Sequence, residues 1–315
     1  MNTASLTEAD VKAAAERISQ RVRRVDVVPL GFDAFPRVRL ADEFMQHGGS
    51  FKARGALNFV SHHAEDGSLS EAGIAIASGG NAGIANAWAG RVTRTPVDVF
   101  LPATAPQVKI DKLHQLGARV HLIDGVYRDA LNASVEHAET TGALLSHAYD
   151  NPLIAAGAGT CALEIRDRLP DLDTIVVAVG GGGLFAGTAA AMFPHGVRVV
   201  AVEPENCRAL NAALAAGGPT DVGLDSVAAD SLGATRVSET AYQLATNPLA
   251  ASVLVSDEQI IAARKALWAD RRVAVEHGAA TALAALLSGA YQPRPDERVA
   301  VVLCGANTDP TDLLR

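Results

Sequence analysis

The stretch TIVVAVGGGGLFAGTAAAMF, residues 174–193, decides the fold of this chain. Its first six residues are mostly β-branched, which is typical of a buried strand, and its last ten are rich in alanine, which is typical of a helix. Four glycines separate the two parts, and each glycine costs about 1 kcal/mol relative to alanine inside a helix. No charged residue occurs from Thr174 to Val197. The glycines nevertheless exclude a membrane span, and the stretch predicts a strand, a loop and a helix.

The same alternation continues on both sides of this stretch. Further strands are expected at residues 38–40, 74–77, 97–101, 120–123, 197–202 and 299–303. Helices are expected at residues 7–21, 52–62, 82–91, 106–116, 127–141, 151–168, 184–193, 207–216, 257–271 and 278–288. Because strands that alternate with helices form parallel sheets covered by helices, we predict an α/β protein with parallel-rich twisted sheets. A chain of 315 residues exceeds the usual size of one core, so two lobes with a site between them are expected.

Composition excludes several classes of partner. The net charge is −8 and the basic residues form no run, so we expect neither nucleic acid nor an anionic membrane as a partner. The three cysteines, Cys161, Cys207 and Cys304, lie far apart, which is typical of a reduced cytoplasmic protein without structural zinc. Residues 1–10 contain no apolar segment behind a basic one, so no secretory leader is expected.

The glycine loop at Gly180, Gly181, Gly182 and Gly183 predicts an anion site. The loop follows a strand and opens a helix, so its free N–H groups and the positive end of the helix dipole converge on one place. The glycine spacing also fits a dinucleotide fingerprint loosely, with Glu203 where an acid for the ribose belongs. An NAD-dependent oxidoreductase therefore stays open as an alternative, as does a glycine turn that serves packing alone.

Lys52 stands apart from the other lysines. It lies in Gly48-Gly49-Ser50-Phe51-Lys52-Ala53-Arg54-Gly55-Ala56, where Ser50 is expected to cap a helix and to place Lys52 in its first turn. The dipole disfavours a cation there, and desolvation lowers an amine pKa further. A neutral buried amine can attack an aldehyde, although a plain surface lysine is the simpler interpretation.

Four motifs together resemble one family over nearly the whole chain. They are Ser-Phe-Lys-Ala-Arg-Gly-Ala at 50–56, Ser-Gly-Gly-Asn-Ala-Gly at 78–83, the glycines at 180–183 and Leu-Cys-Gly-Ala-Asn at 303–307, in this order. The chain resembles the serine/threonine dehydratases among the β-family pyridoxal-phosphate enzymes. The segments 226–233 and 275–278 are similar to serine dehydratases as well. This resemblance implies a two-lobed fold like that of the tryptophan synthase β subunit, called fold type II.

The resemblance also implies roles for individual residues. Lys52 would carry pyridoxal 5′-phosphate as a Schiff base, Asn81 would bind its phenolic oxygen, and Cys304 would face its pyridine nitrogen. The cofactor phosphate would lie on the loop Gly180, Gly181, Gly182, Gly183 and Leu184. The substrate carboxylate would lie on the loop Ser78, Gly79, Gly80, Asn81 and Ala82, whose position between a strand and a helix independently predicts a second anion site.

The chain departs from the family pattern at several positions. Gly79 stands where relatives that racemise serine have a serine, which acts as acid and base on the face opposite the lysine. The divalent-cation site of the family lacks its aspartate, because Ala209 occupies that position, so no metal is expected and Glu203 is expected to cap a helix or to serve packing. His47 and His277 also replace the usual residues, and either could line the site or be a solvated loop histidine.

We therefore predict a small domain at residues 43–147 and a large cofactor domain made of residues 1–42 and 148–315. The predicted reaction converts a β-hydroxy amino acid, L-serine or L-threonine, to a 2-oxo acid and ammonia in a cytoplasmic homodimer. A pyridoxal-phosphate serine racemase, another β-hydroxy amino acid lyase, an NAD-dependent oxidoreductase and a non-catalytic relative stay open as alternatives.

Overall fold

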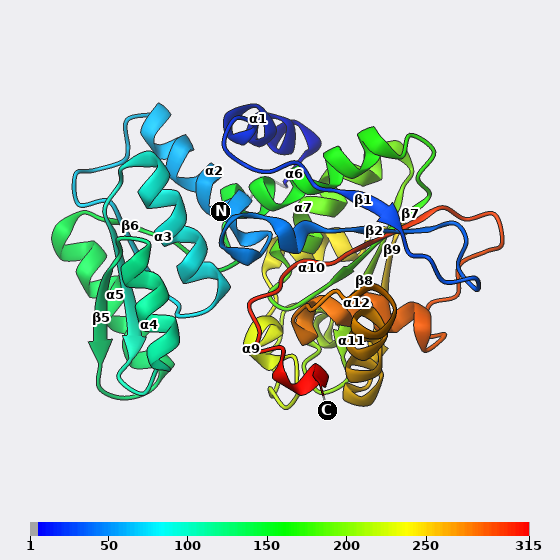
Figure 1. Ribbon diagram of the computed structural model, residues 1–315. Coiled ribbons are helices and arrows are strands. Elements are labelled where there is room, and N and C mark those ends of the chain that lie inside the picture. The colour runs from blue at the N-terminus through cyan, green and yellow to red at the C-terminus, as the bar shows by residue number, and fades with distance from the viewer. Residues whose placement is uncertain (1–5, 315) are drawn as a thin grey trace.

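The described chain forms two β-sheets, whose strands are drawn as arrows in Figure 1. The computed structural model describes residues 6–314. Residues 1–5, which belong to the segment 1–10 where we expect no secretory leader, lie outside the described part. One sheet has six strands and the other has four. The elements of the smaller sheet lie together on one side of the molecule, at the left of Figure 1.

The six-stranded sheet contains the glycine stretch at its centre. Its spatial order is β1 (Val27–Pro29), β2 (Val38–Ala41), β10 (Val299–Val302), β7 (Thr174–Ala178), β8 (Arg198–Pro204) and β9 (Ala250–Val255). Only β1 runs antiparallel to its neighbour within the described sheet. Every residue of β7 and β10 is buried, because helices cover both faces of a parallel sheet.

The four-stranded sheet is parallel throughout its described pairs. Its order is β5 (Arg119–Ile123), β4 (Val97–Pro102), β3 (Ile74–Ala77) and β6 (Leu144–Leu145). These strands come from residues 74–145 and the strands of the larger sheet from residues 27–41 and 174–302. The domain boundaries near 43 and 147 stay a prediction.

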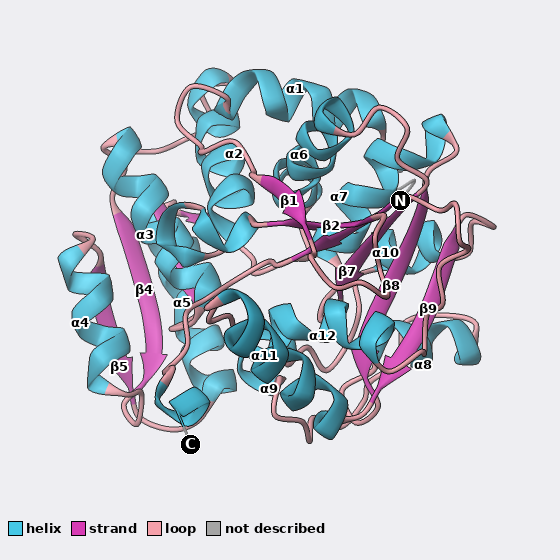
Figure 2. Cartoon of the chain, turned by 45° about the vertical axis from the view of Figure 1, so that its right-hand side comes forward, coloured by secondary structure: helices cyan, strands magenta, loops and turns pink. Residues whose placement is uncertain are grey.

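Helices pack against both sheets, and Figure 2 shows them as cyan coils around the magenta strands. They are α1 (Glu8–Ile18), α2 (Lys52–Glu65), α3 (Asn81–Thr93), α4 (Gln107–Gln115), α5 (Tyr127–Thr141), α6 (Pro152–Arg168), α7 (Gly183–Met192), α8 (Ala209–Ala216), α9 (Ala229–Leu232), α10 (Glu239–Ala245), α11 (Asp257–Arg271) and α12 (His277–Leu287). In both views α1, α6 and α7 lie on one side of the larger sheet, and α11 and α12 lie on the other. Helices α6 and α7 approach closely where Gly159 faces Gly187.

The prediction of an α/β fold with parallel-rich sheets is confirmed. Helices α5 and α11 have the predicted bounds, and the other expected helices differ by a few residues at their ends. The sequence analysis missed β1, β6, β9, α9 and α10. The strands β1 and β6 have three and two residues, which is too short for a periodic pattern, and β9 is a half-buried edge strand.

No helix in the described part of the chain is long and apolar enough to cross a membrane.

Candidate active site around Lys52

Lys52 is the first residue of α2, and surrounding protein atoms desolvate its amine. Desolvation by burial lowers the pKa of this amine to about 8, although nearby Cys304 and Glu276 act in the opposite direction. The Lys52 Nζ donates a hydrogen bond of 2.7 Å to the carbonyl oxygen of Ala148. An amine with a pKa of about 8 is partly neutral near pH 7, so it can act as a nucleophile or a base.

The prediction that Ser50 caps this helix is wrong. The N-cap residue of α2 is Phe51, which makes no side-chain capping bond. Ser50 is extended instead, and its backbone pairs with Gly305 in an isolated antiparallel bridge. The Phe51 N–H also donates to the carbonyl oxygen of Cys304 at 3.0 Å. The lysine is therefore positioned by pairing with the segment after β10, a contact between residues that lie far apart in the sequence.

The glycine loop forms a cradle of free N–H groups. Helix α7 begins at Gly183 after Gly182, which has a positive φ of 93° and no side chain to cap the helix. The N–H groups of Gly183, Leu184 and Phe185 find no acceptor among the described residues, as expected for the first turn of an uncapped helix. A Cβ atom on Gly181 would lie 2.2 Å from the Tyr149 ring, so only glycine fits beneath this ring. The cradle is shaped to receive an anion such as a phosphate.

The loop Ser78–Ala82 opens a second helix N-terminus. Helix α3 begins at Asn81 after Gly80, again without a side-chain capping bond. A Cβ atom on Gly80 would meet no atom within 4 Å, so open space lies in front of this helix. A Cβ atom on Gly79 would lie 2.8 Å from a methyl group of Leu101. The loop can therefore receive a second anion, such as a carboxylate, at the end of β3.

Asn81 joins three distant segments through its amide. Its Nδ2 donates to both carboxylate oxygens of Glu276 at 2.9 Å, and its Oδ1 accepts a bond of 2.7 Å from Asn307. The Asn307 N–H donates to Glu276 at 2.9 Å, and Lys112 of α4 donates to the Asn307 side chain at 2.7 Å. The sequence analysis did not assign Glu276 or Asn307 to the site, although both occur in segments that carry the family resemblance. Burial raises the pKa of Glu276, which the Asn81 bonds partly oppose.

Cys304 lies two residues beyond β10 and is buried. Burial raises the pKa of its thiol to about 12, and Glu276 adds to this rise. The thiol is therefore neutral throughout the physiological range. Cys304 lies at the carboxyl edge of the larger sheet, and parallel sheets bind their ligands at this edge.

The two unusual histidines lie in different surroundings. His47 stacks on Trp88 with ring centroids 4.6 Å apart, beside Gly48 and a hollow of about 500 Å³ that Lys112 also lines. His277 begins α12, and the charges that act on it come from Arg264, Asp312 and Asp257. The structure therefore brings His47 to the border of the site and His277 toward the C-terminal segment.

Glu203 caps a helix, which is one of the two roles that the sequence analysis left open for it. Its carboxylate accepts hydrogen bonds from the N–H groups of Leu210 at 2.7 Å and Asn211 at 2.8 Å, at the start of α8. It is completely buried, and this burial raises its pKa to about 7. A carboxylate held in this way is not available to a ribose, so this geometry does not favour the NAD alternative. Among the described residues, no group of three or more His, Cys, Asp or Glu side chains could hold a metal ion.

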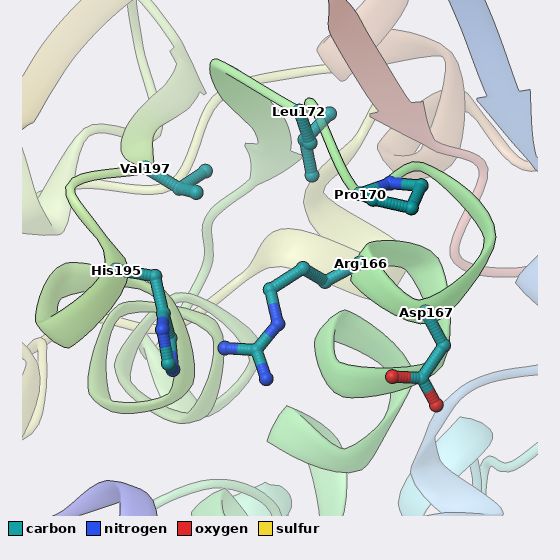
Figure 3. Close-up of a pocket in the computed structure, with 6 residues that line it drawn as sticks. All are labelled: Arg166, Asp167, Pro170, Leu172, His195 and Val197. Atoms are coloured by element: carbon teal, nitrogen blue, oxygen red, sulfur yellow. The ribbon is translucent and has the colours of Figure 1, made fainter.

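A hollow of about 520 Å³ lies at the opposite edge of the larger sheet, as Figure 3 shows. Arg166 and His195 point toward each other across it, with Asp167 at one side. It borders the end of α6 and the start of β8, which is the amino edge of the sheet. It is therefore separate from the site around Lys52.

The residues around Lys52 fit an aldehyde cofactor that carries a phosphate. The amine can take the aldehyde, the cradle that a Cβ atom would fill can take the phosphate, and the second helix N-terminus can take a carboxylate. The fold and the site together define an α/β enzyme that acts on an amino acid through such a cofactor.

The chain belongs to the pyridoxal-phosphate dependent enzymes, whose family model matches residues 27–305. Its cofactor is pyridoxal 5′-phosphate, as the sequence analysis predicted. The chain is 32% identical to the L-threonine ammonia-lyase of Thermotoga maritima over 310 residues, which cover 96% of this chain and 76% of that protein. It is also 32% identical to the phenylserine dehydratase of Ralstonia pickettii over 304 residues, which cover 95% of this chain and 92% of that protein.

Among solved structures, maize serine racemase has a TM-score of 0.89 at 26% sequence identity. The match covers 99% of this chain and 96% of the racemase chain. The predicted family is therefore confirmed, and its relatives include both lyases and racemases.

Proposed function

We propose that this protein is a pyridoxal-phosphate-dependent ammonia-lyase that converts a β-hydroxy amino acid, L-serine or L-threonine, to a 2-oxo acid and ammonia. One observation carries the proposal. The half-buried Lys52, whose amine pKa is lowered by desolvation to about 8, belongs to a site with two uncapped helix N-termini, at Gly183 and at Asn81. The names of the relatives support the lyase over other chemistry of the family.

The residues that would hold the cofactor are Lys52, the cradle, Asn81 and Cys304. The bound cofactor supplies an aldehyde carbon that takes amines and a ring that withdraws electrons from the substrate Cα. The N–H groups of the loop Gly180–Leu184 would bind its phosphate, and Asn81 would bind its phenolic oxygen. Cys304, as a neutral thiol, would donate a hydrogen bond to the ring nitrogen without transferring its proton to it.

The loop Ser78, Gly79, Gly80, Asn81 and Ala82 would bind the substrate carboxylate at the start of α3. The Lys52 amine would then remove the Cα proton, because it is neutral enough to act as a base. Gly79 has no side chain that could deliver a proton to the other face of Cα. Elimination of the β-hydroxyl is therefore favoured over racemisation.

A panel of β-hydroxy amino acids tests this function. We expect L-serine or L-threonine to give a 2-oxo acid and ammonia in equal amounts, with phenylserine included because one relative carries its name. Lys52→Ala is the matched inactive variant, since one amine both carries the cofactor and removes the proton. If no member of the panel yields a 2-oxo acid from the cofactor-loaded protein, the proposed function is wrong.

We further propose the domain division at residues 43–147 and a cytoplasmic homodimer, as the family resemblance implies. Three free and buried cysteines, Cys161, Cys207 and Cys304, support a reducing compartment. Sedimentation equilibrium of the purified protein checks the dimer, and limited proteolysis near residues 43 and 147 checks the domain boundaries.

A further inference from the structure

The turn between β6 and α6 is organised by His147. Its Nδ1 accepts a hydrogen bond of 2.9 Å from the N–H of Asp150 and a longer one of 3.3 Å from the N–H of Tyr149. A ring nitrogen that accepts a hydrogen bond carries no proton. The neutral ring of His147 therefore has its proton on Nε2, and the Nδ1 atom holds the turn closed.

This turn contacts both Lys52 and the glycine loop. Its Ala148 carbonyl oxygen accepts the 2.7 Å bond from Lys52, which is the hydrogen bond that the Lys52 amine makes among the described residues. Its Tyr149 ring covers Gly181 of the cradle, and the Tyr149 hydroxyl donates to the carbonyl oxygen of Arg236 at 3.0 Å. One short segment thus sets the position of the amine and covers the phosphate loop.

The charges around His147 favour its neutral form. Burial is the main cause that lowers the pKa of His147, and the nearby Lys52 amine adds to this effect. Asp150 of the same turn raises the pKa of His147 and so opposes this effect. The Tyr149 ring packs edge-on against the imidazole, with the ring centroids 4.8 Å apart. These three residues are the titratable groups that face the imidazole in the described structure. Protonation of Nδ1 would remove the acceptor of two N–H groups and would add a positive charge beside the Lys52 amine.

We propose that His147 is a positioning residue for Lys52: its neutral ring closes the turn that keeps the Ala148 carbonyl on the lysine amine, and its protonation opens this turn. The proposal rests on the proposed function only in taking Lys52 as the reacting amine. Protonation of the Lys52 amine gives one fall of the activity profile near pH 8, and the titration of His147 then gives a second fall, at a pH below the ordinary pKa of a histidine.

Two substitutions separate this role from a purely structural one. His147→Ala leaves the N–H groups of Tyr149 and Asp150 without an acceptor, and we expect kcat to fall about 10- to 100-fold with a smaller change in KM. His147→Asn supplies an amide oxygen close to the position of Nδ1, which can accept the same two bonds and cannot be protonated. We expect H147N to lose less kcat than H147A and to lose the second, lower fall of the pH profile while it keeps the fall due to Lys52.

His63→Asn is the matched control. His63 lies on α2, three turns after Lys52. Its Nδ1 also takes part in a hydrogen bond, at 2.6 Å from the Ser68 hydroxyl oxygen. We expect H63N to keep both falls of the pH profile of the unaltered protein. An H147N variant that keeps the second, lower fall of the pH profile, or an H147A variant with unchanged kcat, overturns the proposal.

A second measurement does not depend on turnover. Long-range ¹H–¹⁵N correlation spectra of the full chain, assigned by comparison with H147N, report which ring nitrogen of His147 carries the proton. We expect an unprotonated Nδ1 down to a pH below the ordinary histidine pKa, and a protonated Nδ1 at neutral pH overturns the proposal. If the panel of amino acids yields no 2-oxo acid, the proposed function fails while the spectra still decide the role of His147 in the turn.

Discussion

Gly79→Ser tests whether the missing side chain at this position separates elimination from racemisation. The family resemblance places residue 79 on the substrate face opposite Lys52, where a hydroxyl could return a proton to Cα. General acid–base catalysis by one positioned group contributes typically 10²- to 10⁴-fold, so we expect the unaltered protein to form D-serine from L-serine slower than 2-oxo acid by about this factor. G79S should raise the share of D-serine at least about tenfold.

The structure also sets the stability cost of this change. A Cβ atom on Gly79 would lie 2.8 Å from the Cδ2 methyl group of Leu101, whose side chain is only 1% exposed. Overpacking of this kind costs about 1–3 kcal/mol unless the neighbour moves. The double variant G79S/L101V shortens that neighbour, so it should recover part of the lost stability and keep the raised share of D-serine.

The assay measures both products from the same reaction. Chiral chromatography gives D-serine, and a lactate dehydrogenase coupling gives pyruvate. Gly80→Ser is the matched control, because a Cβ atom there would meet no atom within 4 Å and its hydroxyl would lie in front of α3. It should change KM without raising the share of D-serine. Comparable yields of D-serine and pyruvate from the unaltered protein would refute the reasoning and favour the racemase alternative.

Three further predictions follow from the pKa values of single groups. Desolvation lowers the pKa of Lys52 to about 8, so the rate at which the cofactor-free protein takes up pyridoxal phosphate should rise about fivefold from pH 7 to pH 8 and level off above pH 8, as followed by visible absorbance, and K52A should show no uptake. Cys304 is a neutral thiol, so C304S should keep lyase activity while C304D should raise abortive transamination, measured as pyridoxamine phosphate per 2-oxo acid; an unchanged ratio in C304D would contradict the proposed contact with the ring. Burial raises the pKa of Glu203 from 4.5 to about 7, so the folded state keeps this proton longer and the free energy of unfolding should fall by about 3 kcal/mol as the pH rises from 4.5 through 7. Urea unfolding at pH 5 and pH 8 should show a smaller fall in E203Q, and equal falls in both proteins would contradict this account.

The sequence alone predicted those parts of the protein that depend on local signals. The run Thr174–Val179 and the helix after Gly183 are read from apolar composition and from glycines that interrupt a helix. Helix α11 has the bounds expected from residues 257–271, and its capping box joins Ser256 to Gln259, only three positions along the chain. Lys52 and Asn81 were found because they lie in short motifs that a known family carries. None of these inferences needs a contact between distant segments.

Only the tertiary structure decided the contacts that complete the site. Asn81 meets Glu276 across 195 residues of sequence, and Lys52 finds its acceptor in the backbone carbonyl of Ala148, 96 residues away. A carbonyl oxygen is present at every position, so no residue pattern marks the one that binds the lysine. The prediction that Ser50 caps α2 was wrong because of another contact between distant segments. Pairing with Gly305 keeps Ser50 extended and overrides its local preference for a helix cap. Local sequence specifies the elements and motifs, whereas the packing of distant segments specifies which atoms surround the reacting amine.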